Sequence, residues 1–340
     1  MGGHRVAVVG ATGAVGQELL RILEERKFPI AELKVLASGR SAGKEVEFQG
    51  ERVKVEEAQP ESFRGVDLAF FSAGGSVSQE LVPEAVKRGA VCIDNTSAFR
   101  MDPQTPLVVP EVNPEDLRWH QGVIANPNCS TIIMCVALWP LHRAAGLRRI
   151  VVSTYQAVSG AGARAIEALR TQSRAILDGR EFTPEVLPYA KAPRHYQIAF
   201  NLIPQIDVFA EAGYTKEEWK MVHETQKIMH DPEIRVTATT VRVPVFRCHS
   251  ESLNLETERK LTVAEAQRLL SEAPGVALMD DPAQMLYPMP ADLSGRDEVF
   301  VGRVREDPTI PCGLNLWVVG DQIRKGAALN AIQIAELLDA

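Results

Sequence analysis

Residues 4–16 read HRVAVVGATGAVG, and this stretch decides the fold of the first part of the chain. A β-branched run ends at Gly10 and the periodic segment QELLRILEERKF follows, so the order predicts a strand, a glycine-rich turn and a helix. Glycine suits this turn because a side chain would keep a pyrophosphate away from the amides at the helix start. The pattern is typical of a Rossmann-type dinucleotide-binding domain. Its candidate cofactor-binding residues are Gly10, Ala11, Thr12, Gly13, Ala14, Val15 and Gly16.

The end of the second predicted strand, LKVLAS at 33–38, indicates which dinucleotide binds. A site for NAD carries Asp or Glu here, which binds the ribose 2'-hydroxyl. This chain instead has Ser38, Arg40 and Ser41, whose hydroxyl and guanidinium groups suit a 2'-phosphate. The sequence therefore predicts NADP as the cofactor. The alternative is that Arg40 is a solvated loop residue.

Three further apolar runs, at 66–74, 90–99 and 122–128, predict strands that are buried on both faces of a parallel sheet. Each run ends in small or polar residues, among them Ser72 and Asn95. Because the carboxyl ends of parallel strands form the ligand crevice of an open sheet, these residues should line that crevice. The first part of the chain is therefore predicted to be an α/β domain.

The composition is that of an ordinary globular protein, and it excludes several classes. With 340 residues the chain has room for two domains. A formal net charge of -7 gives no overall attraction to nucleic acid, and no apolar run reaches the ~18–20 residues that cross a bilayer. The five cysteines form no CxxC pair and no Cys/His cluster at zinc spacing, so neither a disulfide framework nor a metal site is expected. We expect a reduced, cytoplasmic protein that binds small molecules, without a nucleic-acid or membrane partner.

Cys129 is the candidate nucleophile. It follows Asn126-Pro127-Asn128, and the next residues, STIIMCVALWPLHRAAG, predict a buried helix that ends near Gly146. A cysteine at a helix N-terminus lies near free amides and the positive end of the helix dipole, which favour the thiolate and lower the thiol pKa. A nucleophilic thiol beside a nicotinamide site predicts an aldehyde oxidoreductase that works through a thioester. Such an enzyme also needs an acid/base group and cations for an anionic acceptor.

Seven segments along the chain carry a resemblance to a known family: GATGAVG, LASGRSAG, NTSAFR, NPNCST, QAVSGAG, EEWK and RVPVFRCHSE. Their order and spacing resemble those of the bacterial, NADP-dependent aspartate-semialdehyde dehydrogenases along nearly the whole chain. The resemblance implies the NADPH-dependent reductive dephosphorylation of L-4-aspartyl phosphate to L-aspartate 4-semialdehyde, a reversible reaction. In the family this reaction serves the biosynthesis of lysine, methionine, threonine and diaminopimelate.

The resemblance also implies the roles of individual catalytic residues. Cys129 would form the acyl-thioester, Gln156 would orient the substrate beside the sulfur, and His249 would be the general acid/base. Arg242 would clamp the substrate carboxylate, because a guanidinium grips a carboxylate with two hydrogen bonds. On one straight strand, residues 242 and 249 would face opposite sides, so the segment must bend if both reach one site, and Pro244 is the expected cause.

The charged groups of the substrate have their own candidate partners. By resemblance, Arg100 and Lys220 would hold the phosphate, Glu217 would bind the substrate ammonium, and Asn95 would contact the substrate. From spacing alone, Glu217 and Lys220 lie three residues apart on a predicted helix, and this equally indicates an exposed salt bridge. Only the resemblance favours the binding roles.

Small residues at Ser159 and Gly160 suit close approach of the cofactor, and by resemblance they would touch its nicotinamide side together with Gln322. The chain departs from the family pattern at two positions. Cys248 stands before the histidine where the family commonly has Gly, and Gln322 follows Asp321 where the family commonly has Asn. The amide of Gln322 can still serve the nicotinamide.

We predict two domains. The first is the dinucleotide-binding domain, residues 1–132 together with 315–340, and the second is an α+β substrate and dimerisation domain, residues 133–314. The segment GDQIRKGAALNAIQIAELLDA at 320–340 predicts an amphipathic helix. By resemblance this helix packs back on the first domain, which makes that domain discontinuous. The second domain would pair two copies into a homodimer, with a tetramer as the alternative.

Three other functions fit part of this pattern. N-acetyl-gamma-glutamyl-phosphate reductase shares the fold, the thioester and the cofactor, but its cysteine motif usually reads NPGCY and its acetylated substrate has no cation for Glu217. A malonyl-coenzyme A reductase on the same scaffold would keep the nucleophile and the cofactor site. A non-catalytic NADP-binding redox sensor would use Cys129 as the oxidised thiol, but it leaves Arg242 and His249 without a role.

Overall fold

The computed structural model describes residues 3–338 and divides the chain into two compact units. Unit 1 comprises Met1–Asn128 and Gly326–Ala340, and unit 2 comprises Cys129–Lys325. The boundaries therefore lie at 128/129 and 325/326 and not at the predicted 132/133 and 314/315. The difference arises because the helix that begins at Cys129 packs on the second sheet, and because the strand Gly313–Gly320 is a member of that sheet.

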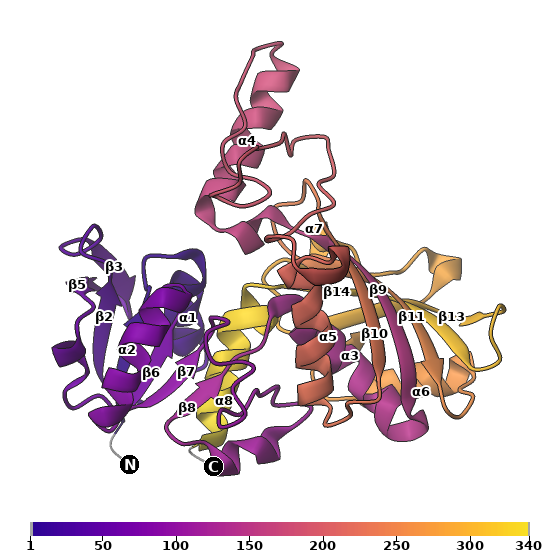
Figure 1. Cartoon of the computed structure of the whole chain (residues 1–340), viewed down its shortest axis with the longest axis horizontal. Helices are drawn as coiled ribbons and strands as arrows, with labels where there is room; N and C mark the ends of the chain where they lie inside the picture. Colours follow the sequence, from indigo (N-terminus) through magenta and orange to yellow (C-terminus); the bar gives the residue numbers. More distant parts are fainter. Residues whose placement is uncertain (1–2, 339–340) are drawn as a thin grey trace. The chain divides into compact units, whose positions relative to one another are not determined.

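Unit 1 is built on a six-stranded sheet in which every neighbouring pair of strands is parallel. The strand order is β5-β2-β1-β6-β7-β8 (Figure 1). The chain begins at the inner strand β1, adds β2 and β5 on one side, and then adds β6, β7 and β8 on the other side, so the direction of the order reverses between β1 and β6. This topology confirms the predicted Rossmann-type domain, in which the point of reversal is where ligands bind. The elements are β1 (His4–Val9), α1 (Ala14–Glu25), β2 (Ile30–Ala37), β3 (Glu45–Phe48), β4 (Glu51–Lys54), β5 (Glu56–Glu57), β6 (Leu68–Phe71), α2 (Gly75–Lys87), β7 (Val91–Asp94), β8 (Val123–Ala125) and α8 (Leu329–Leu338).

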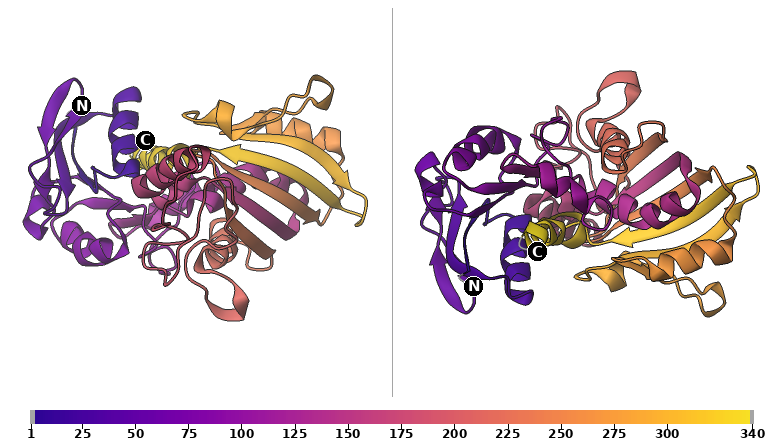
Figure 2. Two further views of the ribbon diagram at one scale, coloured as in Figure 1. Left: turned by 90° about the horizontal axis from the view of Figure 1, so that it is seen from above. Right: turned by 90° about the horizontal axis from the view of Figure 1, so that it is seen from below.

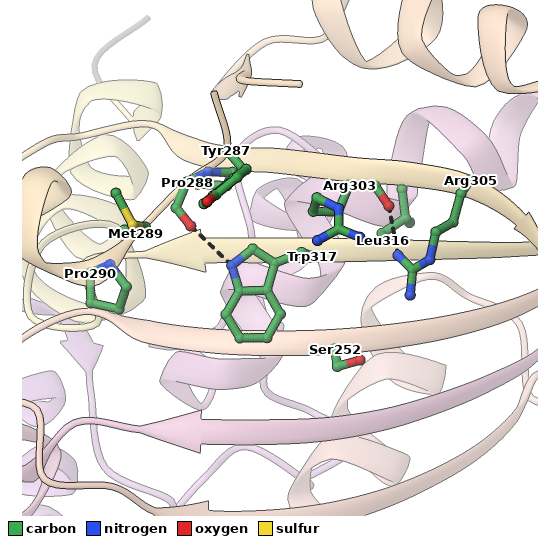
Figure 3. Close-up of a pocket in the computed structure, with 9 residues that line it drawn as sticks. All are labelled: Ser252, Tyr287, Pro288, Met289, Pro290, Arg303, Arg305, Leu316 and Trp317. Carbon is green, nitrogen blue, oxygen red and sulfur yellow. Dashed lines mark hydrogen bonds between the residues drawn. The ribbon is translucent and has the colours of Figure 1, made fainter. Parts of the chain in front are cut away.

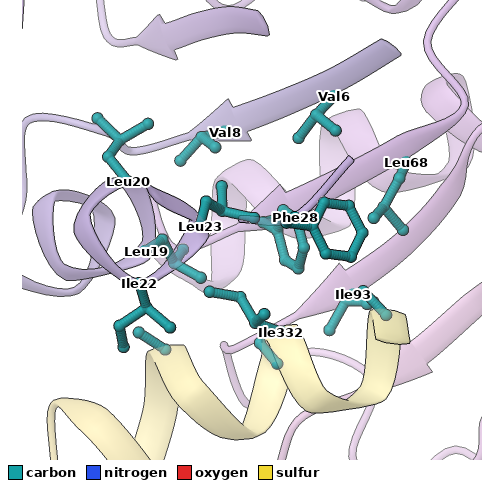
Figure 4. Packing of buried hydrophobic residues seen from close by; sticks show 14 of the residues in the cluster. Val6, Val8, Leu19, Leu20, Ile22, Leu23, Phe28, Leu68, Ile93 and Ile332 are labelled. Carbon is teal, nitrogen blue, oxygen red and sulfur yellow. The ribbon is translucent and has the colours of Figure 1, made fainter. Parts of the chain in front are cut away.

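The core of unit 1 lies on both faces of this sheet. On one face, Val6 and Val8 of β1 pack with α1 and with Ile332 of α8 (Figure 4). On the other face, Ala7 and Val9 pack with α2. Burial on both faces explains why β1 reads as a continuous apolar run with no alternation.

The C-terminal helix is shorter than predicted. The segment from 320 begins with a turn, because the Asp321 carboxylate accepts the amide protons of Ile323 and Arg324 at 3.0 and 3.3 Å. A π-helical turn, Arg324–Ala328, follows, and α8 itself spans Leu329–Leu338. Most of α8 is buried within unit 1, so the helix packs in that unit as the resemblance implies, and it is buried on more sides than an amphipathic helix.

Unit 2 is built on a mixed six-stranded sheet of order β10-β9-β11-β14-β13-β12 (Figures 1 and 2). The pairs β10/β9 and β12/β13 are parallel, and the other pairs are antiparallel. This is the predicted α+β arrangement, with α3 and α5 packed against one another and on the sheet. The elements are α3 (Cys129–Ala145), β9 (Leu147–Gln156), α4 (Ala163–Leu177), α5 (Lys216–Ile228), β10 (Arg235–Arg242), β11 (His249–Thr257), α6 (Val263–Glu272), β12 (Val276–Leu278), α7 (Pro290–Leu293), β13 (Val299–Asp307) and β14 (Gly313–Gly320).

Residues 3–338 lack two features that would mark other function classes. No helix in this range combines the length and apolar character needed to span a membrane. In the same range, no group of three or more His, Cys, Asp or Glu side chains is arranged to hold a metal ion. The five cysteines are free thiols.

Candidate active site

The turn between β1 and α1 leaves no room for side chains at its glycines. Gly10 has φ +89°, and a Cβ atom there would lie 2.7 Å from the carbonyl carbon and oxygen of Ser72. A Cβ atom on Gly16 would overlap the carbonyl oxygen of Gly10. The Gly13 amide donates to that same oxygen at 2.9 Å, and Gly13 caps α1. The first and last glycines therefore let the chain make this tight turn into the start of α1, where helix amides can meet an anion.

A cavity of about 640 Å³ opens beside this turn, where β1, β2 and β6 end. The predicted cofactor residues that line it are Gly10, Thr12, Gly13, Ser38, Arg40 and Ser72. The predicted cofactor residues outside its lining are Ala11, Ala14, Val15, Gly16 and Ser41 in unit 1 and Ser159, Gly160 and Gln322 in unit 2. Ser41 still lies close by, because its hydroxyl bonds the hydroxyl of Thr12 at 3.4 Å.

Glu57 also lines this cavity, and the sequence analysis missed it. A Cβ atom on Gly39 would lie 2.7 Å from Oε1 of Glu57, and Gln59 donates to Oε2 at 3.3 Å. Glu57 reaches the cavity because the two-residue strand β5 pairs with the end of β2. A strand this short has no periodicity, so no local pattern points to it.

Arg100 and Asn95 lie together in unit 1. The buried Arg100 guanidinium donates from Nε to the carbonyl of Asn126 at 3.0 Å and from Nη2 to the carbonyl of Asn95 at 2.7 Å. The Asn126 amide donates to Oδ1 of Asn95 at 2.8 Å. Lys220 belongs to unit 2, so a phosphate site that joins it to Arg100 stays a prediction.

In unit 2, strand pairing brings three predicted residues into one row, which we call the first polar row. Arg242 at the end of β10 pairs with Gln156 at the end of β9. Ser250 of β11 pairs with Tyr155, so its neighbour His249 lies beside Gln156. All three side chains are buried. The segment 243–248 turns back over the end of β9, so the predicted bend after Arg242 is present and the two side chains share one face of the sheet.

His249 is completely buried, and its two ring nitrogens have different surroundings. The backbone amide of Ala157 donates to Nδ1 at 3.1 Å, so the neutral ring carries its proton on Nε2. Nε2 has no hydrogen-bond partner within residues 3–338. Burial lowers the pKa of the imidazole well below its usual value, the Arg242 guanidinium lowers it further, and Glu217 opposes the shift. His249 is therefore a neutral ring with one N–H to offer.

The Arg242 guanidinium is fixed at one end and has a buried donor at the other. Its Nη1 donates to the carbonyl of Ala157 at 2.7 Å, while its Nε has no partner among the described residues. Burial lowers the pKa of the guanidinium, and the negative charges of Glu217 and Cys129 raise it. A Cβ atom on Gly160 would lie 3.0 Å from Nη1 of Arg242 and 3.2 Å from Nε2 of His249. Gly160 thus leaves space directly in front of both groups.

Glu217 and Lys220 on α5 form a charged cluster next to this row. The Glu217 carboxylate accepts the Gln156 amide at 3.2 Å and the Lys220 ammonium at 3.0 Å. Asp207, which the sequence analysis missed, accepts Lys220 at 3.1 Å from a loop. Glu217 is buried, so the cluster is not the exposed salt bridge that spacing alone equally indicates. A capping box between Thr215 and Glu218 fixes the start of α5, from which both side chains project.

Cys129 is the first residue of α3, as predicted, and the helix ends at Ala145. A thiolate at Cys129 would raise the pKa of the Arg242 guanidinium, and both residues belong to unit 2. Cys92 and Cys135 are buried thiols. Burial raises the pKa of both, so each is far less reactive than an accessible thiol. Cys129 is only partly buried.

A hydrogen-bonded chain joins Ser159, Gln322 and Cys248 in unit 2. The Gln322 amide donates to the Ser159 hydroxyl, and the Cys248 amide donates to Oε1 of Gln322 at 2.9 Å. Cys248 has φ +73°, a left-handed conformation that favours glycine. This backbone angle gives a physical reason for the glycine that the family commonly has at this position.

Two family models match the chain. The model described as "Semialdehyde dehydrogenase, NAD binding domain" matches residues 5–120, and the model described as "Semialdehyde dehydrogenase, dimerisation domain" matches residues 138–325. Together they account for most of both structural units.

Individual relatives match over nearly the full length. A protein of Bacillus subtilis named aspartate-semialdehyde dehydrogenase is 59% identical over 99% of this chain and 97% of its own. The crystal structure of aspartate semialdehyde dehydrogenase II from Vibrio cholerae, complexed with ASA, is 48% identical, with a TM-score of 0.93 over 99% of this chain and 98% of that chain. An aspartate semialdehyde dehydrogenase from Candida albicans, solved with NADP, is 25% identical, with a TM-score of 0.75 over 99% and 98% of the two chains.

Proposed function

Since this chain belongs to the aspartate-semialdehyde dehydrogenase family, we propose that it reduces L-4-aspartyl phosphate to L-aspartate 4-semialdehyde through a thioester at Cys129. The observation that carries this proposal is the first polar row, which sets Gln156, Arg242 and His249 beside the cysteine at the start of α3. The reaction is reversible and belongs to the biosynthesis of lysine, methionine, threonine and diaminopimelate.

In the reductive direction, the Cys129 thiolate attacks the acyl carbon of aspartyl phosphate and phosphate leaves, which gives the thioester. When bound, the nicotinamide cofactor supplies the hydride that reduces the thioester carbon. The resulting oxyanion is held by the Nε2–H of His249, the ring proton that the Ala157 contact leaves available. The oxyanion then collapses, the C–S bond breaks, and aldehyde and thiolate are released.

Arg242 and Glu217 supply the charges that recognise an amino acid. Nε of Arg242 is a buried donor with no partner among residues 3–338, and a substrate carboxylate would give it one. The buried Glu217 carboxylate, which already accepts from Lys220, suits the substrate ammonium. An acetylated amine or a malonyl group has no cation for Glu217, so the site favours aspartate semialdehyde over the substrates of the two alternative reductases.

The cofactor of this NAD(P)-binding domain is NADP in our proposal. The glycine turn suits a pyrophosphate, because glycine at positions 10 and 16 lets this tight turn pack against the Ser72 backbone and start α1 beside the cavity. Ser38 and Arg40 line the same cavity where β2 ends, and they would hold the 2'-phosphate. The NADP complex of the Candida albicans relative supports this choice.

Arg40→Asp should reverse the coenzyme preference. We expect kcat/KM with NADP to fall about 10- to 100-fold, because a hydrogen bond to a charged group contributes roughly 1.5–3 kcal/mol and the new carboxylate repels the phosphate. Steady-state kinetics with NADP and NAD measure the ratio. Lys44→Asp is the matched control, since it makes the same charge change at a position outside the cavity. Unchanged discrimination in Arg40→Asp would refute the 2'-phosphate site.

We also propose that two copies associate through unit 2, which the dimerisation-domain model covers. The second sheet has a pocket lined by Trp317, Met289, Arg303 and their neighbours (Figure 3). Tyr155 is partly exposed beside Trp317, with ring centroids 5.5 Å apart. Aromatic residues and arginine are enriched in protein interfaces, and a second copy is the occupant that fits. Light scattering should give the mass of two chains or a multiple, and the mass of one chain would contradict the proposal.

We place the protein in the cytoplasm. Its five cysteines are free thiols, and Cys129 must stay reduced to act as a nucleophile. A compartment that keeps thiols reduced meets this need.

The test of the reaction is NADPH formation from L-aspartate semialdehyde, with and without phosphate. We expect turnover that depends on phosphate, because phosphate must release the acyl group from Cys129. N-acetylglutamate semialdehyde is the control substrate, and it should react far more slowly because it carries no ammonium. Activity with the acetylated aldehyde alone would overturn the assignment of Glu217, and no activity with either would overturn the proposed reaction.

A further inference from the structure

A second polar row lies directly behind the first on the same face of the sheet in unit 2. Thr154 of β9 pairs both with Thr240 of β10 and with Glu251 of β11. Each of these residues stands two positions from a member of the first polar row on its own strand, so the rows are roughly 6.6 Å apart. The next row is apolar, where Val152 pairs with Ala238 and Leu253.

The second polar row is sealed from solvent, and its side-chain oxygens are unsatisfied. Thr154, Thr240 and Glu251 have no measurable exposure. Within residues 3–338, neither threonine hydroxyl and neither oxygen of the Glu251 carboxyl has a hydrogen-bond partner or an ionic partner. Buried polar atoms are seldom left unbonded, so four of them in one row point to a specific arrangement.

The charge state of Glu251 follows from these surroundings. Burial alone raises its pKa well above the usual value for Glu, and no cation compensates for a negative charge there. On the helices packed over the sheet, Cys135 of α3 and Glu224 of α5 are titratable, and besides burial, the charges of Glu251 and Glu224 both raise the pKa of the Cys135 thiol. On its own strand, the nearest such group is His249. None of these groups favours an anion at Glu251.

We propose that Glu251 is a positioning residue that keeps its proton at neutral pH and forms, with Thr154 and Thr240, a neutral hydrogen-bonded layer that holds the first polar row in place. A protonated carboxyl can donate one hydrogen bond and accept others, so a single internal water shared with the two hydroxyls satisfies the row. The proposal rests on the proposed function at one point, namely that the residues of the first polar row are catalytic.

The protonation of Glu251 can be measured without any activity. In the full-length protein at pH 7–8, the infrared spectrum should contain the C=O stretch of a protonated carboxylic acid, and Glu251→Gln should remove this band. Thr154→Val, which keeps the shape of the side chain, should shift the frequency of the same band because it removes a hydrogen-bond partner. A wild-type spectrum with carboxylate bands only would overturn the proposal, even if Glu251→Gln does not fold.

The thermal stability of Glu251→Gln gives an independent reading. A carboxyl whose pKa is raised by folding binds a proton that the unfolded chain has lost, so wild-type stability falls as pH rises above about 4.3. Glutamine has no such dependence, so the Tm of Glu251→Gln minus that of the wild type should increase with pH. Glu256→Gln, on the same strand and partly exposed, is the matched control and should give a flat difference. A flat difference for Glu251→Gln would contradict the protonated state.

The positioning role is tested by two threonines that are neighbours on β10. Thr240 is buried in the second polar row and Thr239 is exposed on the opposite face. Thr240→Val should lower kcat severalfold with little change in KM, and Thr239→Val should change neither. Glu251→Gln, which keeps a neutral hydrogen-bonding group, should keep kcat within about threefold and leave the pH dependence of Cys129 alkylation unchanged. A kcat of Thr240→Val equal to that of the wild type would overturn the positioning role. A shift in the pH dependence of Cys129 alkylation in Glu251→Gln would overturn it as well. Both outcomes hold whether or not the proposed substrate is correct.

Discussion

Cys129→Ser should lower kcat about 10³-fold or more, a loss of at least roughly 4 kcal/mol of transition-state stabilisation. A serine hydroxyl must lose its proton before it attacks. The His249 ring is not free to take that proton, because its Nδ1 already accepts the Ala157 amide and its Nε2 carries the proton. The steady-state rate of NADPH formation from L-aspartate semialdehyde and phosphate measures the loss.

Two controls separate loss of the nucleophile from loss of the fold. Cys312→Ser makes the same change at a partly buried thiol outside the site and should retain full activity. Cofactor binding by Cys129→Ser, followed by fluorescence quenching, should match the wild type, because Cys129 does not line the cofactor cavity. Wild-type turnover in Cys129→Ser would exclude the thioester route.

His249→Asn should lower kcat about 10²–10⁴-fold, the range expected for loss of a group that moves a proton or stabilises an oxyanion. Asparagine is shorter than histidine, so its amide cannot reach both the Ala157 amide and the reacting oxygen. Iodoacetamide should still alkylate Cys129 in this variant at close to the wild-type rate. His223→Asn, on the exposed side of α5, is the control and should be fully active. Full activity in His249→Asn would remove the histidine from the mechanism.

The lowered pKa of His249 predicts how activity depends on pH. Because burial holds the folded pKa well below the usual value near 6.5, the ring is neutral at neutral pH, and kcat should show no histidine limb near pH 6.5. Below that value the unfolded chain gains a proton that the folded chain resists, so the contribution of His249 to stability is lost as pH falls.

The start of unit 1 could be predicted well because its signals are local. The glycines at 10, 13 and 16 lie within seven residues, and the structure shows why side chains do not fit at the first and the last. The helix start at Cys129 is equally local, since a polar loop gives way to a long apolar run. In such stretches, neighbours in sequence are neighbours in space.

The boundaries of the units and the C-terminal helix were harder to predict. Assigning β14 to the second sheet requires its pairing with β11 and β13, which no residue within β14 reveals. The segment after Gly320 looks helical throughout by its apolar spacing, but it begins with a turn at Asp321, passes through the π-helical turn Arg324–Ala328 and becomes α-helical at Leu329. Periodicity samples only the spacing of apolar residues, so it detects neither the strand pairing of β14 nor a side chain that bonds the backbone.

The sequence by itself determined the dinucleotide-binding fold and, through the family motifs, the family and a candidate set of site residues that includes the predicted nucleophile Cys129. Only the tertiary structure decided how these residues work together. The register of three strands sets Arg242, Gln156 and His249 in one row, gives His249 its tautomer through the Ala157 amide, and places the buried Glu251 behind them. The physical reason is that hydrogen bonding and burial act between residues that are close in space. In these rows such residues lie up to 97 positions apart in the sequence, from Thr154 to Glu251, whereas local sequence patterns describe only neighbours.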